Sequence, residues 1–241
     1  MKLIYGFSIV SSFLGLWITS LLPESFELIF GFILIFTFGM IHGSNDLMII
    51  DRLSNSKNPK FFNNLLIYLF VVCSAIVIFY LIPFLALSLF VLFSAYHFGE
   101  QHWEETLSGF SPVLKRLFFF CYGMLILFMI FYFNPDEVVE IVYEITSFRS
   151  LKIYSFEVIT ILVAILFLIT SYGLYIKSIK IESVLSELSL LLILAIIFNA
   201  STLIWGFTIY FILWHSIPSL LDQITFIFGD LEKKSVFKYT I

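Results

Sequence analysis

The stretch GMIHGSND, from Gly39 to Asp46, comes at the end of an almost unbroken apolar run. No residue from Leu28 to Asn45 carries a full charge, and a helix of that length can cross a bilayer. His42 nevertheless lies deep in this run, and Asp46 follows it one helical turn later. Ionisable side chains at such depth are costly, so they face the protein interior and usually serve a function. Their spacing places both side chains on one helix face, about 6 Å apart, and predicts a polar cavity inside a membrane protein.

The composition of the whole chain supports this interpretation. Hydrophobic residues make up 61% of the 241 residues and charged residues only 12%, with a mean hydropathy of +1.05. A soluble domain typically carries about 25% charged residues. We therefore expect an all-α, multi-pass protein of the plasma (inner) membrane, without a nucleic-acid-binding patch. Cys73 and Cys121 both fall inside apolar runs, which favours packed thiols over a disulfide.

Apolar runs separated by polar residues and prolines predict a single domain, 1–241, of about eight transmembrane helices. Their ranges are 3–22, 27–51, 61–82, 84–103, 113–133, 155–176, 184–200 and 202–228. The charged stretch 136–149 has the apolar spacing of an amphipathic interfacial helix. With both termini cytoplasmic, all 13 basic residues except Arg149 and Lys152 lie on the cytoplasmic side. The predicted topology therefore satisfies the positive-inside rule.

Three of the four histidines lie deep within predicted transmembrane helices: His42, His97 in SAYHFGEQHWEE and His215 in ILWHSIPSLLDQ. Each comes 13 to 15 residues after the start of a helix running from outside to inside, so their depths agree within roughly 3 Å. Three imidazoles at one depth can converge on a metal ion, and imidazole suits iron, zinc and copper. The alternative is that each histidine only bridges neighbouring helices by hydrogen bonds.

Polar residues follow two of these histidines at helical spacing. Asp46, Glu100 and Gln101 lie three or four residues beyond His42 or His97, where they can orient a ligand imidazole. Pro218 lacks an N–H and is expected to free the carbonyl of Trp214, kinking the last helix beside His215. His102 points about 140° away from His97 around the helix, and we interpret it as a cytoplasmic interfacial residue.

The motifs GMIHGSNDL, SAYHFGEQHW and WHSIPSLLDQ resemble the three histidine motifs of the Brp/Blh family, bacterial membrane β-carotene 15,15′-dioxygenases. The resemblance implies a non-haem Fe²⁺ enzyme that cleaves β-carotene with O₂ to give retinal, often destined for a rhodopsin. By motif position it assigns the roles of iron ligand and catalytic residue to His42, His97 and His215. It also implies that Asp46 supports His42.

The chain departs from the family pattern at two positions. Ser219 stands where the family usually has a second histidine, one turn after His215, and His102 stands where it tends to have an acidic residue. A serine hydroxyl is a poor iron ligand, so we expect three histidine ligands plus water or a carboxylate, with Ser219 close to the metal. Two alternatives remain at this point: a carotenoid- or retinal-binding relative without catalysis, and a proton or metal transporter using the same buried histidines.

Overall fold

The computed structural model describes residues 2–44, 61–148 and 155–229, and every element within these ranges is helical. Seven of the described helices are long and apolar enough to cross a membrane. The described part of the predicted span 3–22 contains the shorter apolar helix Ile4–Thr19. The predicted fold class, a polytopic all-α membrane protein, is confirmed. The chain divides into two compact units, residues 1–81 with 208–241 and residues 82–207.

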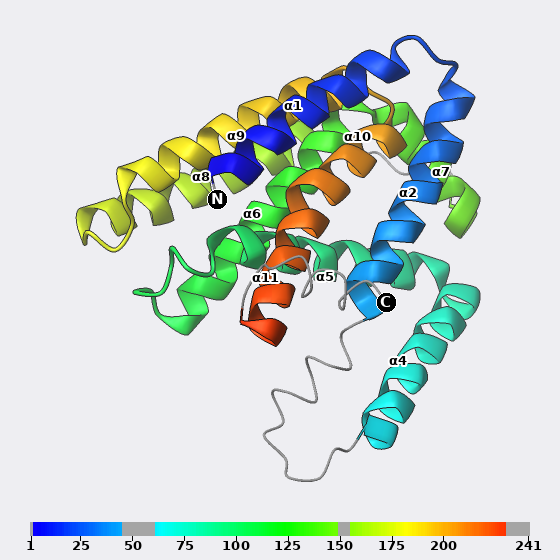
Figure 1. The fold of residues 1–241 in the computed structure, drawn as a ribbon, viewed down its shortest axis with the longest axis horizontal. Coiled ribbons are helices and arrows are strands. Elements are labelled where there is room, and N and C mark those ends of the chain that lie inside the picture. Colours follow the sequence, from blue (N-terminus) through cyan, green and yellow to red (C-terminus); the bar gives the residue numbers. More distant parts are fainter. Residues whose placement is uncertain (1, 45–60, 149–154, 230–241) are drawn as a thin grey trace. The chain divides into compact units, whose positions relative to one another are not determined.

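The first unit contains the N-terminal helices and most of the last membrane helix (Figure 1). In it, α1 and α2 pack against each other, and both pack against η1, a π-helical segment that continues into α11. None of the residues in the apolar window of α4 is buried. The helices of this unit are α1 (Lys2–Thr19), α2 (Glu24–Ser44), α4 (Phe61–Leu81), η1 (Tyr210–Ser216) and α11 (Ile217–Phe228).

The second unit is built around α6, which contacts α5, α7, α8 and α9 and is half buried along its length. Its helices are α5 (Pro83–Trp103), α6 (Pro112–Phe133), α7 (Pro135–Thr146), α8 (Ser155–Tyr175) and α9 (Ile181–Asn199). The helix α10 (Leu203–Ile209) begins in this unit and leads into η1. Prolines occupy the first turns of α5, α6 and α7, where the missing N–H costs nothing.

Two glycines allow α5 and α6 to lie unusually close together. A Cβ at Gly99 would overlap the backbone carbonyl of Phe119, and a Cβ at Gly123 would overlap the carbonyl of Ala95. Membrane helices have little hydrophobic drive to associate, so close backbone packing at small residues is a main source of their affinity. This contact fixes α5, the helix that carries His97, against the centre of the unit.

Polar contacts stabilise the break between α9 and α10. The Glu137 carboxylate of α7 accepts the backbone N–H of Leu203 at 2.9 Å, which supplies a negative charge to the N-terminus of α10. Nearby, the Asn134 side-chain amide donates to the carbonyl of Phe198 at 3.3 Å. These contacts satisfy backbone groups that the end of a membrane helix would leave without partners.

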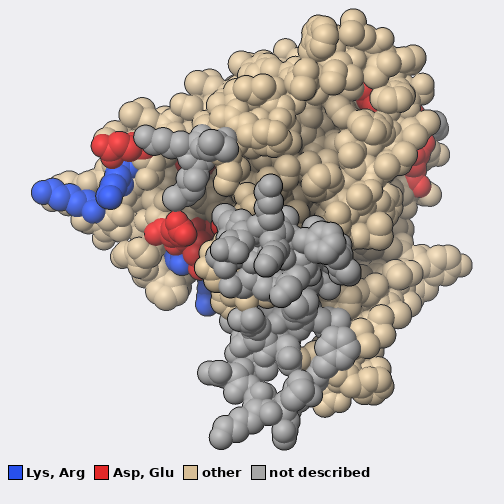
Figure 2. Space-filling view, viewed as in Figure 1, with Lys and Arg blue, Asp and Glu red and all other residues tan. Residues whose placement is uncertain are grey.

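The charges of the second unit are concentrated at helix ends. Lys115 and Arg116 lie in the first turns of α6, whereas Asp136 and Glu137 follow its end in the first turn of α7. Figure 2 shows that charged side chains gather at few places on the face drawn, and that most of the described surface on that face carries no charge. This distribution is what a protein embedded in a bilayer requires. The predicted orientation of the termini stays a prediction.

Candidate functional site

His215 lies within the π-helical segment η1 and is buried, with 1% of its surface exposed. The N–H of Ile217 bonds to the carbonyl of Ile212, five residues back, instead of the usual four. The Phe211 ring packs against the His215 ring, with centroids 5.7 Å apart. The irregularity that the sequence predicts next to Pro218 therefore includes a π turn that ends directly before this proline. Single π turns within α-helices occur frequently at functional sites.

His42 lies in the last turn of α2, and its side chain and Asp46 lie outside the described residues. Its neighbour Ile41 packs, as does Leu220, against the buried pair Ile224 and Ile227 of α11. The end of α2 thus packs against the last membrane helix within the first unit. The helices that carry His42 and His215 belong to one compact unit, and α2 also packs against η1.

His97 lies on α5 in the second unit, and its ring lies beside that of Phe98, with centroids 6.4 Å apart. Within residues 2–44, 61–148 and 155–229, no group of three or more His, Cys, Asp or Glu side chains is arranged to hold a metal ion. The common metal site of His42, His97 and His215 stays a prediction.

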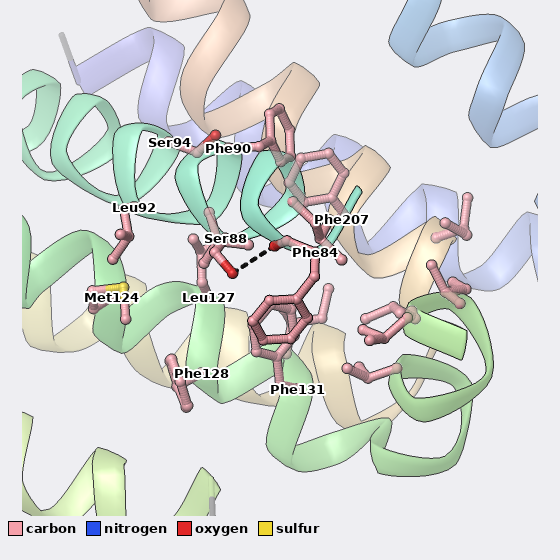
Figure 3. A pocket seen from close by; sticks show the side chains of 18 residues that line it. Phe84, Ser88, Phe90, Leu92, Ser94, Met124, Leu127, Phe128, Phe131 and Phe207 are labelled. Carbon is pink, nitrogen blue, oxygen red and sulfur yellow. Dashed lines mark hydrogen bonds between the residues drawn. The ribbon is translucent and has the colours of Figure 1, made fainter. Parts of the chain in front are cut away.

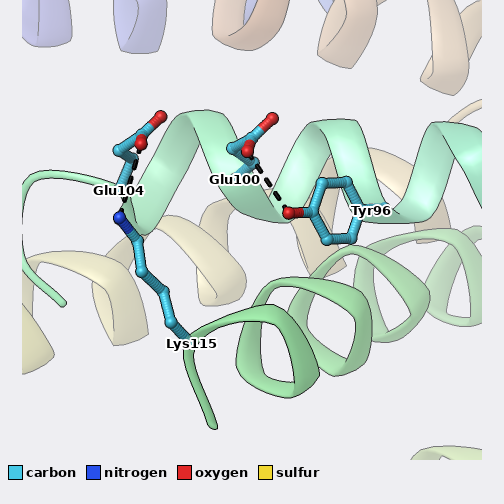
Figure 4. A network of polar contacts seen from close by, with 4 residues as sticks. All are labelled: Tyr96, Glu100, Glu104 and Lys115. Atoms are coloured by element: carbon cyan, nitrogen blue, oxygen red, sulfur yellow. Dashed lines mark hydrogen bonds and ion pairs between the residues drawn. The ribbon is translucent and has the colours of Figure 1, made fainter. Parts of the chain in front are cut away.

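Glu100, predicted to orient His97, contacts Tyr96, the residue directly before His97 on α5 (Figure 4). The hydroxyl of Tyr96, one turn earlier, donates to the Glu100 carboxylate at 3.4 Å. One turn later, Glu104 forms an ion pair with Lys115 of α6 at 3.3 Å. Tyr96, Glu100 and Glu104 follow one another at four-residue spacing, so they form a polar stripe along α5. The predicted roles of Glu100 and Gln101 beside a metal stay predictions.

His102 takes part in a polar cluster that joins three helices of the second unit. Its Nδ1 lies 3.5 Å from the carboxylate of Glu187 in α9, and its side chain is only 10% exposed. The hydroxyl of Tyr122 in α6 donates to the same Glu187 oxygen at 2.5 Å. Sequence reasoning assigned no role to Glu187. The available signal was that Glu187 carries the only full charge between Val184 and Leu221.

An apolar pocket of about 440 Å³ lies in the second unit between α5, α6, α7 and α10 (Figure 3). Aliphatic side chains form most of its wall, together with several phenylalanines, among them Phe84, Phe128, Phe131 and Phe207. Ser88 also lines it, but its hydroxyl donates to the carbonyl of Phe84 at 2.8 Å. Among the residues that the structure describes, no charged side chain lines this pocket. A pocket of this size and chemistry suits a hydrocarbon ligand.

The pocket extends along α5 towards His97. Ser94 belongs to its lining and precedes His97 by three residues, which is about 4.5 Å along a helix axis. The 31 phenylalanines and 12 tyrosines of the chain suit a tunnel for a polyene, but they do not show where such a tunnel lies. Phenylalanine is just as common where membrane helices face lipid, so composition did not place a pocket between these helices.

Together these features define a polytopic helical membrane protein with an apolar pocket. The family model of beta-carotene 15,15′-dioxygenase matches residues 33–240, and the chain belongs to this family. The resemblance to the Brp/Blh family is thereby confirmed. The match contains all three histidine motifs, and the family implies dioxygenase activity on a carotenoid. Neither the curated proteins nor the solved structures contain a significant match.

Proposed function

We propose that this protein is an iron-dependent carotenoid oxygenase, which cleaves β-carotene or a related carotenoid with O₂ to give retinal within the membrane. The observation that carries the proposal is the family match, which covers the motifs around His42, His97 and His215 in one continuous region. Three neutral imidazoles are a donor set that suits Fe²⁺ and leaves coordination positions open. Bound ferrous iron would supply O₂ activation, which redox-inert zinc does not.

The apolar pocket would hold one hydrocarbon end of the carotenoid. Its 440 Å³ lie within the range of small-molecule sites, roughly 300–1,000 Å³, and its aromatic side chains offer flat faces to a conjugated chain. Since the pocket reaches Ser94, a polyene bound in it would extend along α5 towards His97. In this proposal the second unit orients the substrate and excludes water from it.

Metal analysis and product analysis on the same preparations test the proposal. The protein is purified in detergent, iron per chain is measured, and retinal is extracted from β-carotene-producing cells that express it. We expect bound iron and retinal for the unmodified protein, and a loss of both for His97→Ala and His215→Ala. His102→Gln is the control, because His102 already has a partner in Glu187, and it should keep its iron.

Two results would contradict the proposal in different ways. Iron content and retinal yield that are unaffected by both histidine variants would rule out His97 and His215 as ligands. Carotenoid bound to the purified protein without iron and without retinal would instead favour a binding protein that performs no cleavage.

A further inference from the structure

The π turn at His215 leaves one backbone carbonyl without its usual donor. In a regular α-helix the N–H of Ile217 would bond to the carbonyl of Leu213, but here it bonds to Ile212. In the π register the next donor to Leu213 would be residue 218, which is a proline and has no N–H. Both the α and the π patterns therefore fail to supply a backbone donor to Leu213. A buried carbonyl without a partner is costly, so another donor is required.

That donor comes from α1, more than 200 residues earlier in the sequence. The hydroxyl of Ser8 donates to the Leu213 carbonyl at 2.8 Å, and Ser8 is 1% exposed. One turn further along α1, the Ser12 hydroxyl accepts the indole N–H of Trp214 at 3.0 Å. The two residues that directly precede His215 are thus both bonded to α1.

A third contact lies on the same face of α1. The Tyr5 and Trp214 rings meet edge to face, with centroids 5.2 Å apart. Tyr5, Ser8 and Ser12 have the three- and four-residue spacing that places side chains on one stripe of a helix. Helix α1 precedes the region matched by the family model, which begins at residue 33. The α1 side chains of these contacts therefore lie outside the matched region, whereas Leu213 and Trp214 lie inside it.

We propose that Ser8 and Ser12 are positioning residues, which hold the π turn in place and thereby set the direction of the His215 imidazole. Without the Ser8 hydroxyl, the Leu213 carbonyl needs another donor. The nearest is the Ile217 N–H, which would bond to Leu213 as in a regular α-helix instead of to Ile212. That change removes one residue from the turn and rotates one side of the helix relative to the other by about 100°. Only the consequence for iron rests on the proposed function; the effect on the helix does not.

Hydrogen–deuterium exchange on the full-length protein in detergent tests the effect on the helix directly. The peptide that covers residues 209–217 is followed in the unmodified protein and in Ser8→Ala, Ser8→Thr and Ser20→Ala. We expect exchange about five-fold faster in Ser8→Ala and recovery in Ser8→Thr, which keeps the hydroxyl. Ser20→Ala is the matched control, because Ser20 is exposed and its hydroxyl donates to the Trp17 carbonyl, which is close to it in the chain and far from η1 in sequence.

A second substitution tests the proposed reason for the effect. Pro218→Ala restores an N–H that can reach the Leu213 carbonyl, so the Ser8 hydroxyl should then matter much less. We expect Ser8→Ala to change exchange less than about two-fold in the Pro218→Ala background. An equal effect of Ser8→Ala in both backgrounds would overturn the proposal, and so would equal exchange of Ser8→Ala and Ser20→Ala.

Iron content and kinetics on the same variants separate this inference from the proposed function. Ser8→Ala should lower iron affinity or kcat by about tenfold, as substitutions beside a metal ligand do, and leave KM unchanged. If the unmodified protein binds no iron, the proposed function fails while the exchange data still decide the role of Ser8. Iron bound equally by the unmodified protein and Ser8→Ala, together with faster exchange, would overturn the positioning of His215.

Discussion

Gly123 of α6 lies so close to Ala95 of α5 that a Cβ at position 123 would overlap the Ala95 carbonyl. The obstacle is backbone, which cannot move aside as a flexible side chain can. Together with the contact of Gly99 with Phe119, this holds the two helices at a separation that only glycine permits, about half a turn on either side of the level of His97.

The first prediction concerns this contact. Gly123→Ala should force α5 and α6 apart and destabilise the protein by about 1–3 kcal/mol, as overpacking does. The measurement is thermal unfolding of the purified protein in detergent. Gly6→Ala is the control, because a Cβ at Gly6 meets nothing within 4 Å. An unchanged melting temperature for Gly123→Ala would show that the two helices can separate at no cost.

The second prediction concerns the polar cluster of His102, Tyr122 and Glu187. Tyr122→Phe removes a hydrogen bond to a carboxylate, which is worth about 1.5–3 kcal/mol when largely buried. The same unfolding measurement should show this loss. Tyr132→Phe alters an exposed tyrosine on the same helix and should leave stability within about 0.5 kcal/mol. Equal losses of stability from the two substitutions would show that the cluster does not stabilise the packing of α9.

The third prediction tests the pocket as the carotenoid site. Val91 lines the pocket, so Val91→Phe should fill part of it and displace the substrate. Because small displacements of a reacting bond are costly, we expect retinal yield to fall by roughly tenfold or more. Iron per chain should not change. Val113→Phe is the control at a position that is 77% exposed on α6. Unchanged retinal yield from Val91→Phe would place the substrate elsewhere.

The fourth prediction concerns Ser219, three residues beyond the end of η1. A histidine there should add an imidazole near the proposed iron, so Ser219→His should raise iron per chain. The unmodified protein should cleave β-carotene weakly or at a different bond. Strong cleavage that Ser219→His leaves unchanged would show that a fourth histidine was never limiting.

Much of the helical architecture follows from the sequence because it depends on local signals. Long uncharged runs indicate membrane helices, and Pro83 and Pro112 mark helix starts because proline suits the first turn. The weak break near residue 200 is visible as a short polar interruption. Each of these signals lies within a few residues of the helix or helix end that it specifies.

The features that sequence reasoning missed depend on contacts between distant residues. Glu187 contacts His102 of α5 and Tyr122 of α6. The π turn is stabilised by the Ser8 hydroxyl, which donates to the Leu213 carbonyl. Pro218 indicates an irregular helix but not the register that the helix adopts. The convergence of His42, His97 and His215 stays a prediction, because local spacing fixes the depth of a residue but not the direction in which it points.

The π turn also affects how the last membrane helix will tolerate substitution. A helix that is α-helical throughout shows one repeating pattern of sensitive and tolerant positions along its length. Here η1 holds an extra residue, so the pattern before Tyr210 and the pattern after Ser216 are out of step by one position. Scanning mutagenesis from Leu203 to Phe228 will therefore show two regular patterns with a phase shift between them, and His215 will lie at the shift.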